Sequence, residues 1–149
     1  MDAPTPVPTA LADALARSAW AYPALEVLHI VGIALLLGNL VMLELRVWGA
    51  AAQIPPRVLA RLALPAVLGG FGLLALSGLA MFATQPAELL ANRAFVWKLA
   101  LVGLAALNAA LFHLRDGLGR LDGWARAQTA LSLGLWLGAI ILGRAIAYA

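Results

Sequence analysis

The chain has no cysteine among its 149 residues, which excludes a disulfide framework, a zinc–thiolate site and a cysteine-held iron–sulfur cluster. Charge is also scarce. Charged residues make up 11% of the chain, against roughly 25% in an average soluble domain, and the net charge is only +3. So few ionised groups cannot solvate the surface of a compact soluble monomer, and they provide no basic stripe for a nucleic acid. Both of these classes of protein are therefore excluded.

Apolar residues, in contrast, make up 64% of the chain and gather into four runs. Each run is close to the ~20 residues that an α-helix needs to cross the hydrocarbon core of a bilayer. The connections between the runs are short and contain glycine, proline and asparagine, so consecutive helices should be antiparallel neighbours. The sequence therefore predicts an all-α integral membrane protein, an up-down bundle of four transmembrane helices over residues 24–48, 62–82, 94–114 and 126–148.

Residues 1–23 are expected to form a periplasmic N-terminal segment ahead of the transmembrane domain, which takes up residues 24–149. The start of the chain is acidic and proline-rich and has no basic region, so we expect no cleaved signal peptide. Thr9 is expected to cap a short helix that ends at Trp20 and lies in the membrane interface. Pro23 suits the first turn of the first span, where its missing N–H removes no helical hydrogen bond.

The basic residues indicate the orientation, because cytoplasmic loops of membrane proteins retain lysine and arginine. Six of the ten lie around the first and third connections, and four lie at the opposite helix ends. This bias predicts that both termini are periplasmic and that the protein lies in a bacterial inner membrane. The six are Arg46, Arg57, Arg61, Arg115, Arg120 and Arg126, and the four are Arg17, Arg93, Lys98 and Arg144.

Ionisable side chains within apolar spans are costly, so each one is a candidate functional residue. At a rise of about 1.5 Å per residue, four of them share the level of the periplasmic helix ends. These are Glu26 and His29 in the first span, Lys98 in the third and Arg144 in the fourth. Glu26 and His29 are three residues apart and therefore also share a helix face.

A second group of polar residues lies near the cytoplasmic ends of the spans. Glu44 is expected to form an ion pair with Arg61 or Arg115, and His113 lies beside Arg115. Because His29 and His113 differ in depth by roughly 20 Å, one haem iron cannot bind both within one protomer. A haem would therefore be held at the periplasmic level, with His29 as a ligand.

Several residues at that level suit a haem site. Lys98 or Met81 is the candidate second ligand. Gly32, one turn below His29, offers a surface without a side chain either to a flat macrocycle or to a neighbouring helix. Arg144 matches a haem propionate or an anionic headgroup. The alternative interpretations are that His29 is a packing histidine paired with Glu26 and that Lys98 snorkels to the interface.

Two motifs also carry a family resemblance. The stretch Leu28-His29-Ile30-Val31-Gly32, continuing through Gly38 to Glu44-Leu45-Arg46, resembles the first helix of CopD-like copper-resistance proteins and of HemJ-type protoporphyrinogen oxidases. Trp97-Lys98-Leu99 strengthens the second comparison. In HemJ-type proteins an early histidine and a later lysine are the key positions and haem b is the cofactor. The resemblance thus implies that His29 and Lys98 are the functional pair.

The chain is similar as well to a bacterial family of four-helix membrane proteins from which no activity follows. Together these features predict a protein that binds haem b and serves electron transfer or a membrane redox reaction, with enzyme activity left open. His29 and Lys98 are the predicted iron ligands. The alternative functions are cofactor-free transport or metal handling through a protonatable Glu26, His29 and Lys98 gate, and a purely structural subunit.

The expected partners are the lipid bilayer, a quinone or periplasmic redox protein, and a second copy of the chain. The last of these rests on small residues, which let transmembrane helices approach closely. The second span contains four glycines, and they predict a homodimer: Gly69, Gly70, Gly72 and Gly78.

Overall fold

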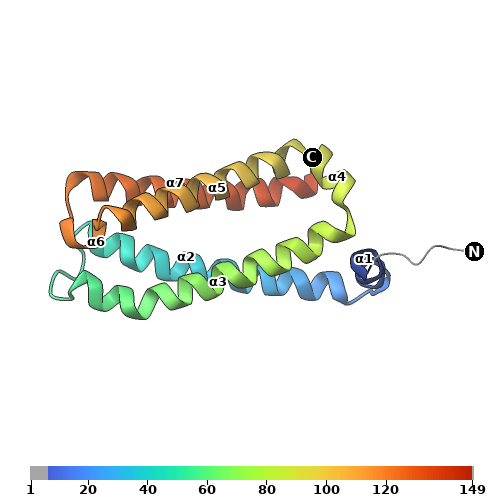
Figure 1. Cartoon of the computed structure of the whole chain (residues 1–149), viewed down its shortest axis with the longest axis horizontal. Coiled ribbons are helices and arrows are strands. Elements are labelled where there is room, and N and C mark those ends of the chain that lie inside the picture. Colours follow the sequence, from blue (N-terminus) through green and yellow to red (C-terminus); the bar gives the residue numbers. More distant parts are fainter. Residues whose placement is uncertain (1–6, 149) are drawn as a thin grey trace, which may run out of the picture.

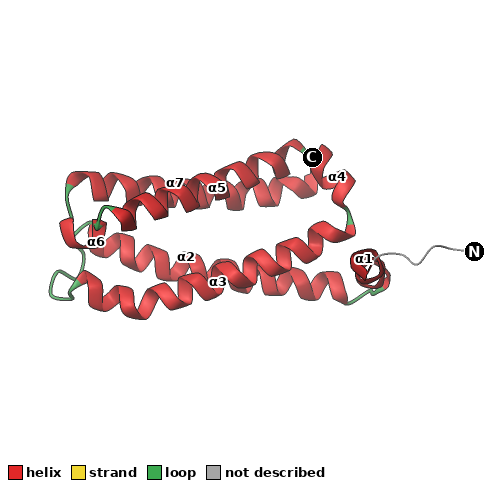
Figure 2. Cartoon of the chain, viewed as in Figure 1, coloured by secondary structure: helices red, strands yellow, loops and turns green. Residues whose placement is uncertain are grey.

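The computed structural model describes residues 7–148, and within this range every regular element is helical. Four long helices run along the long axis of the molecule, and shorter helices lie at its two ends (Figures 1 and 2). One end, here called the α1 end, also holds α4 and the last turn; the other is called the α6 end. The elements are α1 (Val7–Arg17), α2 (Ala21–Val47), α3 (Pro56–Thr84), α4 (Pro86–Ala91), α5 (Arg93–Leu114), α6 (Gly117–Arg120), α7 (Gly123–Ala145) and a 3₁₀ turn (Ile146–Tyr148).

The four predicted spans are confirmed as α2, α3, α5 and α7, each long and apolar enough to cross a membrane. Some helix ends lie outside the predicted bounds. α3 begins at Pro56, well before residue 62, because a proline in the first helical position loses no intrahelical hydrogen bond. α2 begins at Ala21, which places Pro23 in its first turn as expected. Prolines therefore mark the starts of the first two spans.

The N-terminal helix is present but has different bounds from those expected. α1 begins at Val7, so Thr9 lies inside the helix and is not its cap, and the helix ends at Arg17, before Trp20. Figure 1 shows α1 nearly end-on, whereas the long helices lie across the view, and α1 contacts both α2 and α3. A helix that crosses the bundle end in this way has the direction expected for a helix lying in the interface.

The bundle consists of two antiparallel helix pairs, α2 with α3 and α5 with α7. The first pair is closest where Gly32 meets Gly70. A Cβ added to Gly70 would lie 2.7 Å from the backbone nitrogen of Leu36, and a Cβ added to Gly32 would lie 2.8 Å from that of Leu74. Neither position has room for a side chain. Gly32 therefore serves the helix crossing, and its predicted role as a surface for a macrocycle is wrong.

The other glycines of α3 divide between the inside of the bundle and its surface. Gly70 packs against α2, and Gly78 packs against the ring of His29. A Cβ added to Gly69 or Gly72 would meet nothing within 4 Å. Two of the four glycines expected at a dimer contact are thus used within the protomer, and the homodimer stays a prediction that concerns Gly69 and Gly72.

The two helix pairs pack together at the α6 end. Val47, Phe112 and Ala125 form a buried apolar cluster there, and Leu118 of α6 packs against it. The indole nitrogen of Trp48 donates a hydrogen bond of 2.8 Å to the Thr129 hydroxyl, which joins the end of α2 to α7. These contacts join α2, α5 and α7. The helix α3 is connected to Leu118 through a neighbouring apolar cluster.

Aromatic contacts join the pairs away from the α6 end. The rings of Phe82 in α3 and Phe95 in α5 stack with their centroids 5.7 Å apart. Phe71 in α3 meets the ring of Trp136 in α7 edge-on at 6.3 Å. Such pairs contribute about 0.5–1.5 kcal/mol beyond the area that they bury.

The outside of the bundle is apolar along its length. In the most hydrophobic window of α2, α3 and α7, only 11% of the residues are buried inside the protein, and in α5 17% are. Large aromatic side chains mark the ends instead: Trp20 and Trp97 are exposed at the α1 end, and Trp124 is exposed at the α6 end. An apolar belt between aromatic ends is typical of a protein surrounded by lipid.

Candidate functional site

His29 lies half-buried between α2 and α3, and its ring is held by a serine. The Nδ1 atom is 3.0 Å from the hydroxyl oxygen of Ser77. That hydroxyl lies 2.7 Å from the carbonyl oxygen of Leu73 and donates its own proton there. The Ser77 oxygen is therefore the acceptor and the His29 Nδ1–H is the donor. In a neutral ring this tautomer leaves the lone pair on Nε2.

Small residues from two other helices surround this histidine and the nearby lysine. A Cβ added to Gly78 would lie 3.3 Å from Cε1 of the His29 ring. On the other helix pair, a Cβ added to Gly143 would lie 3.4 Å from Nζ of Lys98. Lys98 is half-buried on α5 at the same end of the bundle. Each of the four long helices thus contributes at least one residue to the His29 cluster at the α1 end: His29, Ser77, Gly78, Lys98 and Gly143.

The remaining predicted site residues lie at this end but outside the cluster. Arg144 is exposed; it donates a hydrogen bond of 2.6 Å to the Tyr148 hydroxyl, and its guanidinium lies 4.9 Å from the centre of that ring. Glu26 is exposed on α2. Met81 is half-buried on α3, one turn beyond Ser77 and on the same helix face. The structure therefore turns His29 and Lys98 partly into the bundle at this end and leaves Arg144 and Glu26 at the surface.

The two histidines lie at opposite ends of the bundle, as expected from their positions along the helices. His29 is near the start of α2, at the α1 end, whereas His113 is next to the last residue of α5, at the α6 end. The His113 ring is exposed and meets the ring of Phe112 edge-on at 5.4 Å. One metal ion cannot contact both rings of one protomer.

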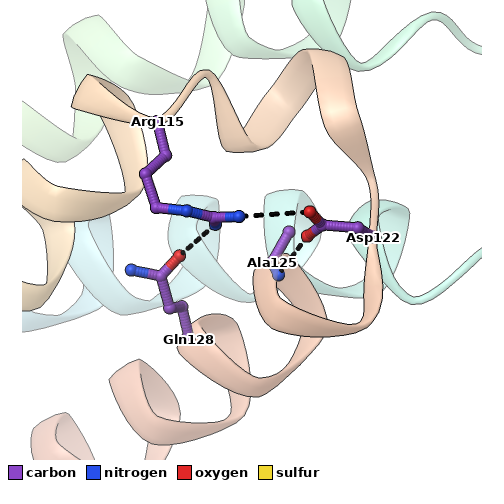
Figure 3. A network of polar contacts seen from close by, with 4 residues as sticks. All are labelled: Arg115, Asp122, Ala125 and Gln128. Carbon is purple, nitrogen blue, oxygen red and sulfur yellow. Dashed lines mark hydrogen bonds and ion pairs between the residues drawn. The ribbon is translucent and has the colours of Figure 1, made fainter.

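Arg115 organises a polar network at the α6 end (Figure 3). Its guanidinium donates to the side-chain oxygen of Gln128 at 3.1 Å and to the carboxylate of Asp122 at 3.1 Å. Asp122 caps α7 by accepting a hydrogen bond of 2.7 Å from the Ala125 amide. That amide, and secondarily Arg115, hold the pKa of the Asp122 carboxyl below its usual value. Arg115 therefore joins the end of α5 to α7 and its cap.

Glu44 does not form the ion pair expected for it. Its side chain is only 2% exposed, and neither carboxylate oxygen has a hydrogen-bond partner among the described residues. Arg115 is engaged by Gln128 and Asp122, and Arg61 is exposed at the start of α3. Glu44 lines a cavity of about 50 Å³ that is bordered also by the polar side chains of Asn108, His113, Gln128, Thr129 and Ser132.

Ser77, Gly143 and the isolation of Glu44 were not expected from the sequence. A serine in an apolar helix commonly bonds to the carbonyl one turn earlier, as Ser77 also does, so its type does not indicate a partner on another helix. One available signal was its spacing of seven residues from Gly70, which places both on the helix face that meets α2.

Within residues 7–148, no three histidine, cysteine, aspartate or glutamate side chains gather where they could hold a metal ion. The predicted ligand pair of His29 and Lys98 therefore lacks the third side chain that a metal bound by protein groups alone requires. The chain matches no protein-family model, no curated protein and no solved structure.

Proposed function

We propose that this protein binds haem b at the His29 cluster and serves electron transfer or a membrane redox reaction. The observation that supports this proposal is the hydrogen bond from His29 Nδ1 to Ser77, which leaves Nε2 as a lone-pair donor. Histidines that bind metals are almost always held through their other ring nitrogen in this way. A histidine that only fills space between helices does not require a free lone pair on Nε2.

The residues around His29 suit a haem better than a bare metal ion. A porphyrin supplies four nitrogens, so the protein needs to provide only one or two axial ligands. Lys98 is the proposed second ligand, since a buried amine that has lost its proton can coordinate a metal. When bound, haem b supplies a one-electron carrier. His29 and Lys98 would hold it, and Ser77 fixes the orientation of the His29 ring.

The absorption spectrum of the purified protein tests this proposal. We expect a Soret band in detergent-solubilised protein, and sharpened visible bands after reduction. A protein that shows no Soret band, even after expression with added haem precursor and reconstitution with haem, contradicts the proposal. That result would favour the alternative without a cofactor, in which His29 and Lys98 serve as protonatable groups.

Lys98→Met distinguishes a ligand from a neighbouring charge. If Lys98 binds the iron, exchange of its amine for a thioether shifts the Soret band and raises the reduction potential. We expect both changes, measured by spectroscopic redox titration. Arg93→Met, which removes an exposed cation at the start of the same helix, is the matched control and should change neither quantity. Equal spectra for the wild type and Lys98→Met would exclude lysine ligation.

We propose further that the α1 end faces the periplasm of a bacterium and the α6 end faces the cytoplasm. The proposal rests on the excess of arginines at the α6 end, among them Arg57 and Arg120. Fusion of a reporter that is active only in the cytoplasm should give no activity at residue 149 and strong activity when inserted at residue 52, between α2 and α3. The reverse pattern would invert the orientation. A periplasmic redox protein would then be an unsuitable partner for the His29 end.

A further inference from the structure

The Glu44 cavity lies at the α6 end, away from the His29 cluster, and none of its lining residues belongs to that cluster. Glu44 comes from α2, Asn108 from α5, and Thr129 and Ser132 from α7, so the cavity is assembled where the two helix pairs meet. Asn108, Gln128 and Thr129 are each less than 9% exposed. Polar side chains from three helices are thus gathered around one buried carboxylate.

The charge of Glu44 is uncompensated by the described residues. Glu44 is the only acidic residue among those that line the cavity, and the lining contains no lysine or arginine. His113 of α5 is the other titratable group that borders it, and its ring is largely exposed. Arg115 of α5 is held by Gln128 and Asp122. An isolated carboxylate without water or a partner is very costly, so a positive species must neutralise it.

Besides the carboxylate, two of the residues that line the cavity have a side-chain oxygen that can accept a further contact, Asn108 and Ser132. The Asn108 amide nitrogen donates to the Gln128 backbone carbonyl at 2.8 Å, which leaves its carbonyl oxygen as an acceptor. The Ser132 hydroxyl also borders the cavity. Oxygen ligands of this kind suit small hard cations. The single carboxylate balances one positive charge, whereas a divalent ion would leave an excess charge in a poorly solvated site.

The size of the cavity sets a further limit. A cavity needs a volume of roughly 10–15 Å³ to hold one water molecule. The Glu44 cavity, at about 50 Å³, therefore accommodates a small ion with a few waters. It does not accommodate a large organic cation. We propose that the cavity at Glu44 is a binding site for a small monovalent metal cation such as Na⁺, which competes with a proton for the carboxylate.

Calorimetric titration of sodium chloride into the detergent-solubilised protein, in a sodium-free choline buffer, tests this proposal. We expect saturable binding of one Na⁺ per chain at pH 8 and release of a proton into a weakly buffered solution. If one ion replaces one proton, the apparent affinity falls by up to about tenfold for each unit by which the pH is lowered. Absence of saturable Na⁺ binding in the wild type would overturn the proposal and leave a proton as the neutralising species.

Two variants and a control locate the site. Glu44→Gln keeps the shape of the side chain without its charge, so it should fold and lose Na⁺ binding. Glu88→Gln, which removes an exposed carboxylate on α4 at the other end, should bind Na⁺ as the wild type does. Unchanged binding in Glu44→Gln would place the ion elsewhere. If that variant fails to fold, Ser132→Ala decides: it removes one oxygen and should weaken binding at least several-fold, and an unchanged affinity would overturn the proposal.

Discussion

We expect His29→Ala to abolish haem binding while the protein still inserts into the membrane. The substitution removes the proposed axial ligand, and the apolar length of α2 is unchanged. Loss of even a group that only orients a metal ligand costs about 10–100-fold in affinity, so loss of the ligand itself should cost more. The measurement is the Soret absorbance per mole of purified protein, with the amount of protein in the membrane fraction determined in parallel.

Two further variants make this result specific. His113→Ala removes the other histidine, at the α6 end, and should leave the spectrum and the haem content as in the wild type. Ser77→Ala keeps the ligand and removes the hydrogen bond that orients it, so it should lower the affinity for haem by an intermediate factor of about 10–100. Equal loss of haem in His29→Ala and His113→Ala would contradict a single site at the α1 end.

Gly70→Ala sharply destabilises the bundle, whereas Gly69→Ala does not. An added Cβ at position 70 lies 2.7 Å from the Leu36 nitrogen and 2.8 Å from the Gly32 oxygen, and backbone atoms on a packed helix cannot move aside cheaply. Overpacking typically costs about 1–3 kcal/mol, and contact with backbone on both sides places this change at the upper end. At roughly 2–4 °C per kcal/mol, the midpoint of thermal unfolding should fall by several degrees.

Gly69 is the matched control, because it is the preceding residue of the same helix and an added Cβ there meets nothing within 4 Å. Alanine is favoured over glycine in a helix by about 0.8–1.0 kcal/mol, so Gly69→Ala should leave the unfolding midpoint unchanged or slightly higher. The measurement is size-exclusion chromatography of the detergent-solubilised variants after heating. Equal midpoints for the two variants would mean that the α2–α3 crossing tolerates a wider separation than the structure has.

The fold could be predicted from the sequence because lipid imposes a simple length requirement. Each span had to supply about 20 apolar residues, and short connections left only the up-down arrangement. Depth was also predictable, since it follows from counting residues along a helix. For that reason His29 and Lys98 were correctly expected at one level and His113 at the other. The residues at which helices begin were harder to predict than their depth, since α3 begins at Pro56 and not at residue 62.

Contacts between helices could not be predicted, because they depend on the rotation of each helix about its own axis. Apolar residues surround these spans on all sides, so no hydrophobic stripe fixes which face turns inward. From the sequence, Gly32 was compatible with a cofactor surface, but in the structure α3 packs against it. Glu44 was compatible with an ion pair to Arg115, but Arg115 binds Asp122. The hydrogen bond from His29 to Ser77 depends on the same rotation.

The division into two helix pairs also has a consequence for biogenesis. All residues of the Gly32–Gly70 crossing belong to the first 84 positions, so the N-terminal hairpin can close while the second is still being synthesised. The walls around Glu44 are different, because Asn108, Thr129 and Ser132 belong to α5 and α7. Until the last helix enters the membrane, this carboxylate is not enclosed by its final neighbours. Docking of the second hairpin is therefore the step of assembly at which the acidic side chain becomes enclosed by its final neighbours.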